Sequence, residues 1–163
     1  MFAYGSLMGD AVLGSYRARP ARLTGFHRAF LHESRKRWGS AVAPCPILGL
    51  AAGGECWGLV FEVPDADRRV VENALARREA AGERQRETRG VETAEGPVDA
   101  TVWVSRSPGG NGAVDLPAVE ARLRGAHGAV GNGTEYVRTV AHALGLHGIE
   151  DPLVDTLWRR LQE

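Results

Sequence analysis

A four-residue segment near the start of the chain, Tyr4-Gly5-Ser6-Leu7, has the composition of an anion-binding turn. It follows Phe2 and Ala3, which together with Tyr4 are typical of a short buried strand, and Gly5-Ser6 is a turn-prone pair. A turn directly after a buried strand can expose consecutive backbone N–H groups, which bind a carboxylate or an oxyanion. An ordinary turn has the same composition, so these residues alone leave both interpretations open.

Glu79 is a candidate general base. It falls near the C-terminal end of a helix that we expect to start at Pro64-Asp65 and to end near Gly82. A carboxylate there meets the negative end of the helix dipole, which favours its protonated form and suits proton transfer. The segment from Arg77 to Arg84 also fits a solvated charged surface, so the residues by themselves do not decide between the two interpretations.

Two cysteines and five histidines are the other reactive side chains. We expect Cys56, in an apolar run, to be an inert core thiol, and Cys45, between two prolines, to be more exposed; alternatively the two face each other across a hairpin. A hydrolase with Ser6 or Cys45 as nucleophile is a further alternative, although Ser6 does not lie in a Gly-x-Ser-x-Gly motif. No histidine or cysteine pair has metal-ligand spacing, so we expect no metal site.

The chain length fits one domain spanning residues 1–163, and the order of the elements expected below makes it an α+β domain. A hydrophobic fraction of 44% is ordinary for a globular protein. Twenty basic residues balance twenty acidic ones, so we expect neither a nucleic-acid nor a membrane partner. No apolar run approaches the roughly 20 residues of a membrane helix, and no secretory signal is visible. We therefore expect a cytoplasmic protein, either a monomer or a homodimer.

Hydrophobic spacing and turn residues predict strands first and helices last. We expect strands at 2–4, at 21–23 and 26–32 on either side of Gly25, and at 88–93 and 98–104, with a hairpin of 47–51 and 56–61 around Gly53-Gly54. A helix over 65–79 should bury one stripe, and residues 105–114 should form a loop. Three helices should follow, capped by Asp115, Thr134 and Asp151. The buried stripe is expected to consist of Val70, Val71, Ala74 and Leu75.

Several segments in this order resemble the γ-glutamylcyclotransferase family, and in particular its ChaC-like branch. They are Phe2-Ala3-Tyr4-Gly5-Ser6-Leu7, Gly25-Phe26-His27-Arg28-Ala29-Phe30 with Ser34, Leu48-Gly49-Leu50 with Cys56 to Phe61, Leu75 to Glu79, and Gly131 to Leu157. The resemblance implies a mixed β-barrel or sheet with flanking helices and a helical C-terminal third. It also implies that Tyr4-Gly5-Ser6-Leu7 is the substrate loop and that Glu79 is the acid/base residue.

The activity that the resemblance implies is release of 5-oxoproline from a small γ-glutamyl substrate, which needs no cofactor. Tyr4, Ser6 or Arg28 would hold the substrate's α-carboxylate. Two positions depart from the family: Glu83 stands where an aromatic residue is common, and Met8-Gly9-Asp10 lacks the tryptophan that often follows the loop. A non-catalytic small-molecule-binding member of the same fold is the main alternative, and Glu83 is the alternative base.

Overall fold

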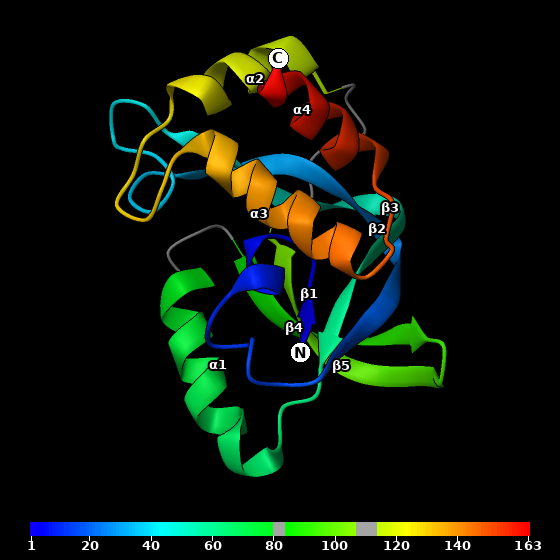
Figure 1. Ribbon diagram of the computed structural model, residues 1–163. Helices are drawn as coiled ribbons and strands as arrows, with labels where there is room; N and C mark the ends of the chain where they lie inside the picture. Colours follow the sequence, from blue (N-terminus) through cyan, green and yellow to red (C-terminus); the bar gives the residue numbers. More distant parts are fainter. Residues whose placement is uncertain (80–83, 107–113) are drawn as a thin grey trace.

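The computed structural model describes residues 1–79, 84–106 and 114–163, and of Glu79 the backbone alone. These residues form an α+β structure in which helices cover an antiparallel sheet of strand order β1-β3-β2-β4-β5 (Figure 1). The expected fold class is therefore confirmed. The strands are β1 (Phe2–Ala3), β2 (Ala18–Ser34), β3 (Cys45–Phe61), β4 (Arg84–Thr93) and β5 (Gly96–Ser105). The helices are the 3-10 helix η1 (Ser6–Gly9) and the α-helices α1 (Asp65–Glu79), α2 (Leu116–Gly125), α3 (Gly133–Leu146) and α4 (Pro152–Gln162).

The sheet curls into a partly closed barrel. β1 and β5 lie at opposite ends of the strand order, yet they contact each other. Strand side chains such as Leu23, Leu50 and Val102 are buried together inside the curl. A second core lies between the sheet and the helices α2, α3 and α4, which gather at one end of the molecule (Figure 1). Burial of these two apolar clusters fixes the positions of the strand ends that surround the site.

The expected hairpin within residues 47–61 is wrong, because these residues belong to one long strand. β3 pairs along its length with β2, and the pieces of β2 on either side of Gly25 are likewise one strand. The register shifts where Gly25 (φ 85°) faces Gly53 (φ 91°) and Gly54 (φ 72°). Glycine adopts such positive φ values without steric cost both in a tight turn and in a β-bulge. Because β3 continues past Gly53-Gly54, these glycines mark a bulge in the strand and not a reversal of the chain.

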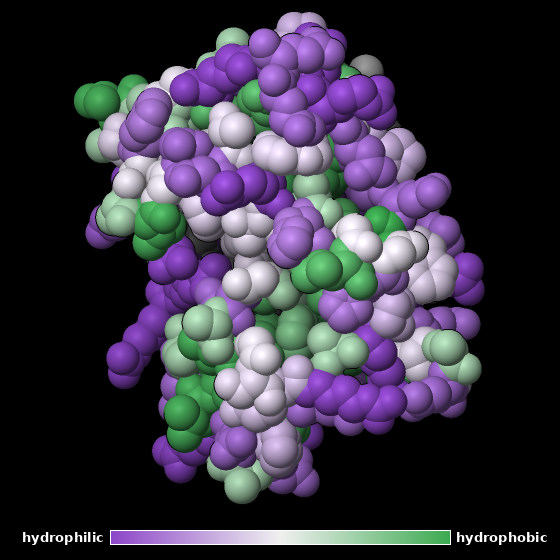
Figure 2. Space-filling model, viewed as in Figure 1, coloured by the Kyte–Doolittle hydropathy of each residue, from purple (hydrophilic) through white to green (hydrophobic). Residues whose placement is uncertain are grey.

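Helix α1 buries a narrower stripe than expected. Val71 and Leu75, four residues apart, are 3% and 1% exposed. Val70 is 72% exposed and Ala74 is also exposed, which corrects their assignment to the core. A hydrophobic patch is visible over α1 on the surface in Figure 2. The helix therefore packs against the rest of the molecule along one narrow stripe. Ala74, beside this stripe, borders the cavity described below.

The helix caps of the C-terminal third are confirmed in two cases of three. The carboxylates of Asp115 and Asp151 accept hydrogen bonds from the N–H groups of Ala118 and Val154, as expected of N-caps. The expected cap at Thr134 is wrong: Asn132 caps α3, in a reciprocal capping box with Glu135. The box needs a glutamate three residues after the cap, and only Asn132 has one.

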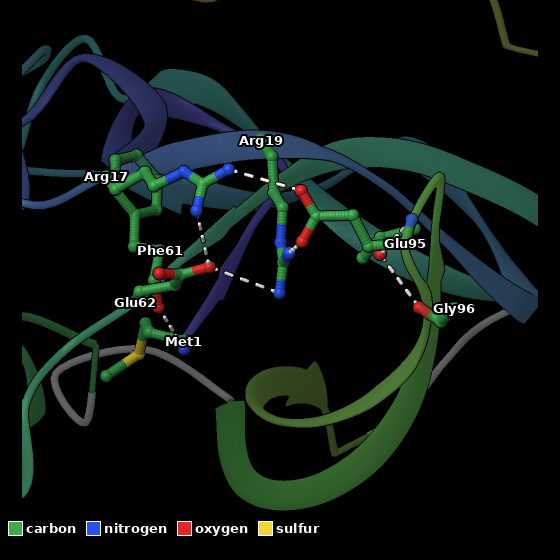
Figure 3. Close-up of polar contacts among 8 residues, drawn as sticks. Met1, Arg17, Arg19, Phe61, Glu62, Glu95 and Gly96 are labelled. Atoms are coloured by element: carbon green, nitrogen blue, oxygen red, sulfur yellow. Dashed lines mark hydrogen bonds and ion pairs between the residues drawn. The ribbon is translucent and has the colours of Figure 1, made fainter.

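An exposed arginine cluster, consisting of Arg17, Arg19, Glu62 and Glu95, links β2 to its neighbours (Figure 3). Arg17 lies 3.9 Å from Glu62 and 3.2 Å from Glu95, measured between side-chain nitrogen and oxygen atoms. Arg19 lies 3.2 Å from Glu62 and also pairs with Glu95. Beside the cluster, the Met1 amine donates to the Phe61 carbonyl (3.0 Å). Within the described part of the chain, no helix is long and apolar enough to cross a membrane.

Candidate active site

A cavity of about 960 Å³ opens where the start of the chain meets the end of α1. Its walls are the segment from Tyr4 to Leu7, the last turn of α1, residues 32–38 after the middle of β2, and parts of β3, β5 and α3. The volume is in the range of small-molecule sites. All four residues of the predicted substrate loop therefore line one cavity.

The loop is held by hydrogen bonds at both of its ends. The Tyr4 hydroxyl donates to the Trp103 carbonyl of β5 at 2.7 Å, and the tyrosine is only 6% exposed. Past Gly5, the Met8 N–H donates to the Gly5 carbonyl at 3.0 Å and opens η1. Ser6 and Leu7, the first two residues of η1, border the cavity, and the first N–H groups of a helix have no acceptor within that helix.

Arg28 supports the loop from behind and is not among the described residues that border this cavity. Its Nε donates to the Tyr4 carbonyl (2.7 Å) and its Nη2 to the Trp57 carbonyl (2.6 Å). Its Nη1 pairs with Asp151, the N-cap of α4. With 2% of its side chain exposed and these donors engaged, Arg28 fixes the backbone of Tyr4; the structure does not bring it to the cavity with the other predicted substrate-binding residues.

The end of α1 is tied to the loop by Arg78. This arginine forms an ion pair with Asp10 and donates from Nη2 to the Ser6 hydroxyl at 3.4 Å. Arg77 also borders the cavity. The side chain of Glu79, and the whole of Glu83, lie outside the described residues. The backbone places Glu79 directly after two residues of the cavity wall.

His32 of β2 borders the cavity and pairs with Ser105 of β5 behind it. His32 Nε2 and Ser105 Oγ are 2.7 Å apart, and Ser105 is 2% exposed. Burial, and secondarily the charge of Arg84, lowers the pKa of His32 to about 4. The imidazole is therefore neutral at pH 7. Arg84 itself donates to the Leu48 carbonyl at 2.7 Å.

Tyr136 of α3 connects the substrate loop to the segment after β2. Its hydroxyl oxygen accepts from the Leu48 N–H at 2.8 Å and would lie 3.6 Å from a Cβ on Gly5. Its ring meets the Trp38 indole edge to face, with the centroids 5.6 Å apart. Tyr136 is fully enclosed, and burial raises the pKa of its hydroxyl. These two aromatic rings form a continuous part of the wall between the loop and residues 35–38.

The cavity wall carries an excess of positive charge. Its described acidic residues are Asp10 and Glu33, and both form ion pairs with arginines. Its basic residues are Arg35, Lys36, Arg37, Arg77, Arg78 and Arg84. Six cations against two described carboxylates favour an anionic ligand. The electrostatics thus suit a small molecule that carries carboxylates.

The surroundings of the two cysteines do not favour a nucleophilic thiolate. Both are buried and unpaired with each other, which excludes the disulfide alternative. Cys45 is 0% exposed, not the more exposed thiol that we expected, and burial raises its pKa to about 12 and that of Cys56 to about 11. A thiol with such a pKa stays protonated near neutrality. Ser6 receives a hydrogen bond from Arg78, which cannot act as its base, so the described contacts of Ser6 give the hydrolase alternative no support.

Sequence reasoning missed several residues of the wall. His32, Arg37 and Trp38 come from the end of β2 and the turn after it, and Trp103 and Tyr136 come from β5 and α3. The two aromatic residues from β5 and α3 lie in apolar runs that predict core, and both are indeed buried. Among the side chains that the structure describes, no three His, Cys, Asp or Glu residues come together as metal ligands would.

Comparisons with known proteins identify relatives over the full chain. The family model for ChaC-like proteins matches residues 1–163. No curated protein matches the sequence. A yeast γ-glutamyl cyclotransferase specific to glutathione has a similar structure, with a TM-score of 0.85 at 17% identity, covering 99% of this chain and 94% of that one.

More distant structures share the same fold. A γ-glutamyl cyclotransferase superimposes with a TM-score of 0.61 at 17% identity, over 96% of this chain and 83% of that one. The protein YkqA from Bacillus subtilis has a TM-score of 0.58 at 15% identity; the match covers all of this chain and 54% of YkqA. At these identities the likeness establishes the fold.

Proposed function

This chain belongs to the ChaC-like family, and we propose that it is a γ-glutamylcyclotransferase-like enzyme that releases 5-oxoproline from a γ-glutamyl compound. The donor would be glutathione, a γ-glutamyl amino acid or a γ-glutamyl amine, and no cofactor takes part. The observation that carries the proposal is the bond between Arg78 and Ser6. It joins the residue before Glu79 to the proposed substrate loop, and Arg78 and the loop both border one cavity.

The reaction is an intramolecular aminolysis. The α-amine nitrogen of the γ-glutamyl group attacks the carbonyl carbon of the side-chain amide, a five-membered ring closes, and the bond to the leaving nitrogen breaks. Because nucleophile and electrophile belong to one molecule, holding the substrate in a folded shape supplies much of the acceleration. A cavity whose wall is tied together by hydrogen bonds, such as that from Tyr4 to the Trp103 carbonyl, is suited to that task.

Glu79 would move the proton in this mechanism. An α-amine has a pKa near 8 and is mostly protonated at neutral pH, so it must lose a proton before it attacks. Glu79 would accept this proton and deliver it to the leaving nitrogen. The position of Glu79, directly after Arg77 and Arg78 in the cavity wall, supports this role.

The substrate loop would bind the charge that forms on the reacting oxygen. N–H groups of Ser6 and Leu7 are candidate donors to the oxyanion, and losing one such donor typically costs about 3 kcal/mol of transition-state stabilisation. Tyr4 and Ser6 would contact the substrate's α-carboxylate together with the cations of the wall. Arg28 would act indirectly, by holding the backbone of Tyr4 through a hydrogen bond from its guanidinium to the Tyr4 carbonyl.

The test is 5-oxoproline release from a panel of γ-glutamyl donors, with Glu79→Gln compared with the wild type. We expect kcat to fall at least about 100-fold in Glu79→Gln, the usual contribution of an acid/base residue, while thermal unfolding is unchanged. Glu83→Gln is the matched control and should retain activity. Near-normal turnover in Glu79→Gln would refute the assignment, and loss in Glu83→Gln alone would identify that residue as the base.

A binding protein of the same fold is the competing outcome. If no donor yields 5-oxoproline while the product binds with a measurable Kd, the cavity serves binding and the proposed reaction is wrong. The charge of the wall alone suits both possibilities, so the activity assay is decisive.

A further inference from the structure

The ion pair between Asp10 and Arg78 is the more enclosed of the two that join α1 to other described residues. The side chains of Asp10 and Arg78 are 13% and 14% exposed. In the other pair, between Glu72 and Arg86, the arginine side chain is 53% exposed. Water and salt loosen an exposed ion pair far more than an enclosed one. The geometry of the Asp10–Arg78 pair is therefore the better defined of the two.

Asp10 is held in place by its own backbone and by one of its carboxylate oxygens. It follows η1, where its N–H donates to the Leu7 carbonyl at 3.1 Å and its carbonyl accepts from the Gly14 N–H at 2.9 Å. Its Oδ1 accepts from the Val12 N–H at 2.9 Å. Its Oδ2 forms the contact with Arg78. Since both oxygens are engaged, we expect Asp10 to act through Arg78 and not on the substrate itself.

Arg78 carries the orientation of Asp10 to the substrate loop. Its Nη1 pairs with Asp10, and its Nη2 donates to the Ser6 hydroxyl at 3.4 Å. The guanidinium is planar and rigid, so an ion pair that fixes Nη1 also fixes the direction of Nη2. Asp10, Ser6 and Arg78 all border the cavity. One side chain from α1 thus meets both ends of the segment from Ser6 to Asp10.

The last turn of α1 has little apolar support. The buried side chains of this helix, Val71 and Leu75, precede residues 76–79, and of the described side chains in that turn Ala76 alone packs against the core. The end of a helix frays readily, because its last carbonyls have no partner within the helix. An ion pair in this turn therefore decides where the end of the helix, and with it the backbone of Glu79, lies relative to the loop.

We infer that Asp10 is a positioning residue: through Arg78 it holds the end of α1, and so Glu79, at a fixed distance from the substrate loop. The inference rests on the proposed function, since it concerns how the proposed base and the loop are kept together. In an intramolecular reaction the substrate is held in a folded shape between these two groups, so a displacement of one against the other by about 1 Å costs rate. Asp10 therefore contributes to the rate without touching the substrate.

The test is 5-oxoproline release by Asp10→Asn. The amide keeps the shape of the side chain and an oxygen for the Val12 N–H, but it removes the charge that attracts Arg78. We expect kcat to fall about 10- to 100-fold, because the loop and the end of α1 lose their fixed distance, with KM little changed. Asp10→Glu, which restores the charge, should recover part of the rate. In the Arg78→Met background Asp10→Asn should have no further effect, because the two residues act as a unit.

Glu72→Gln is the matched control. It removes the same charge from the other ion pair of α1, and Glu72 is not among the described residues that border the cavity. It should keep the wild-type kcat. A wild-type kcat in folded Asp10→Asn would overturn the inference, as would an equal loss in Glu72→Gln. A rise in KM at unchanged kcat would also overturn it, because it would indicate that Asp10 contributes to binding and not to the position of the base.

Amide hydrogen exchange in the absence of substrate separates this inference from the reaction itself. In Asp10→Asn we expect the N–H groups of residues 76–79 to exchange about 10-fold faster than in the wild type, because the last turn opens locally when a charge-assisted contact is lost, while α4 keeps its rates. Faster exchange without 5-oxoproline release from the wild type would support the tie and refute the proposed reaction. Unchanged exchange would overturn the inference, and release of 5-oxoproline would then still support the reaction.

Discussion

Two groups of arginine ion pairs hold β2 to its surroundings, and they differ in burial. The Arg28 centre, consisting of Arg28, Asp151 and the carbonyls of Tyr4 and Trp57, is almost fully enclosed, with 2% of the Arg28 side chain exposed. In the exposed arginine cluster the side chains of Arg17 and Glu95 are 65% and 58% exposed (Figure 3). Solvent competes for every bond in the second group and for almost none in the first.

The comparison shows that residue type says little about the role of an arginine in this chain. The Arg28 centre joins the loop of the candidate site, β3 and the N-cap of α4 through one side chain. The exposed cluster joins the same strand to a turn and a strand end. The partners that each guanidinium has decide whether it stabilises the fold or positions the site.

The largest effect is expected from Arg28→Met. It leaves a carboxylate and two carbonyls without their donor, and breaking a buried pair in this way typically costs about 3–5 kcal/mol of unfolding free energy. Urea denaturation measures the loss, and the activity of the protein that remains folded should fall as Tyr4 loses its support. Arg22→Met, which removes half-exposed pairs with Glu55 and Glu92, is the control and should cost about 1 kcal/mol or less. Similar losses in the two variants would contradict the comparison.

An intermediate effect is expected from His32, which is half-buried. Because its folded-state pKa is about 4, lower than the 6.5 of an ordinary histidine, the unfolded chain binds a proton between these values and the folded protein does not. This contribution to stability is present above pH 6.5 and is lost as the pH falls toward 4, with a slope of at most about 1.4 kcal/mol per pH unit. His32→Gln should flatten the profile of unfolding free energy in that window. An identical profile would show that His32 titrates normally in the folded protein.

The smallest effect is expected from Glu95→Gln in the exposed cluster. It weakens the pairs with Arg17 and Arg19, and we expect a loss of about 0–1 kcal/mol that shrinks further in 1 M salt. A double-mutant cycle with Arg17→Met, followed by thermal unfolding at low and high salt, measures the coupling. A coupling above about 2 kcal/mol would remove the distinction between the two groups.

Local signals in the sequence were sufficient for much of the fold. Asp115 with Pro117 and Asp151 with Pro152 predicted two helix starts, because capping depends on neighbours within three or four residues. The Gly53-Gly54 pair misled the prediction, because positive φ serves a reversal and a bulge equally well. The pairing of β3 with β2 decides that a bulge forms and not a turn. No local sequence pattern indicates this pairing.

The candidate site was predictable only where a motif is continuous in sequence. The loop from Tyr4 to Leu7 was found because its four residues are adjacent, and the structure places all four at the cavity. Arg28 was predicted to touch substrate, yet its partner Asp151 lies 123 residues away, and its burial depends on that contact.

The long separation between Arg28 and Asp151 has a consequence for how the protein is made. During synthesis Tyr4 and Arg28 emerge early, and the carboxylate that completes their contact is added more than a hundred residues later. Until then the guanidinium lacks its anionic partner, and the nascent chain cannot fix the loop in its final place. We expect the ribosome-bound chain to be unable to bind substrate until Asp151 has been translated, so that only molecules whose last helix has begun to form can act.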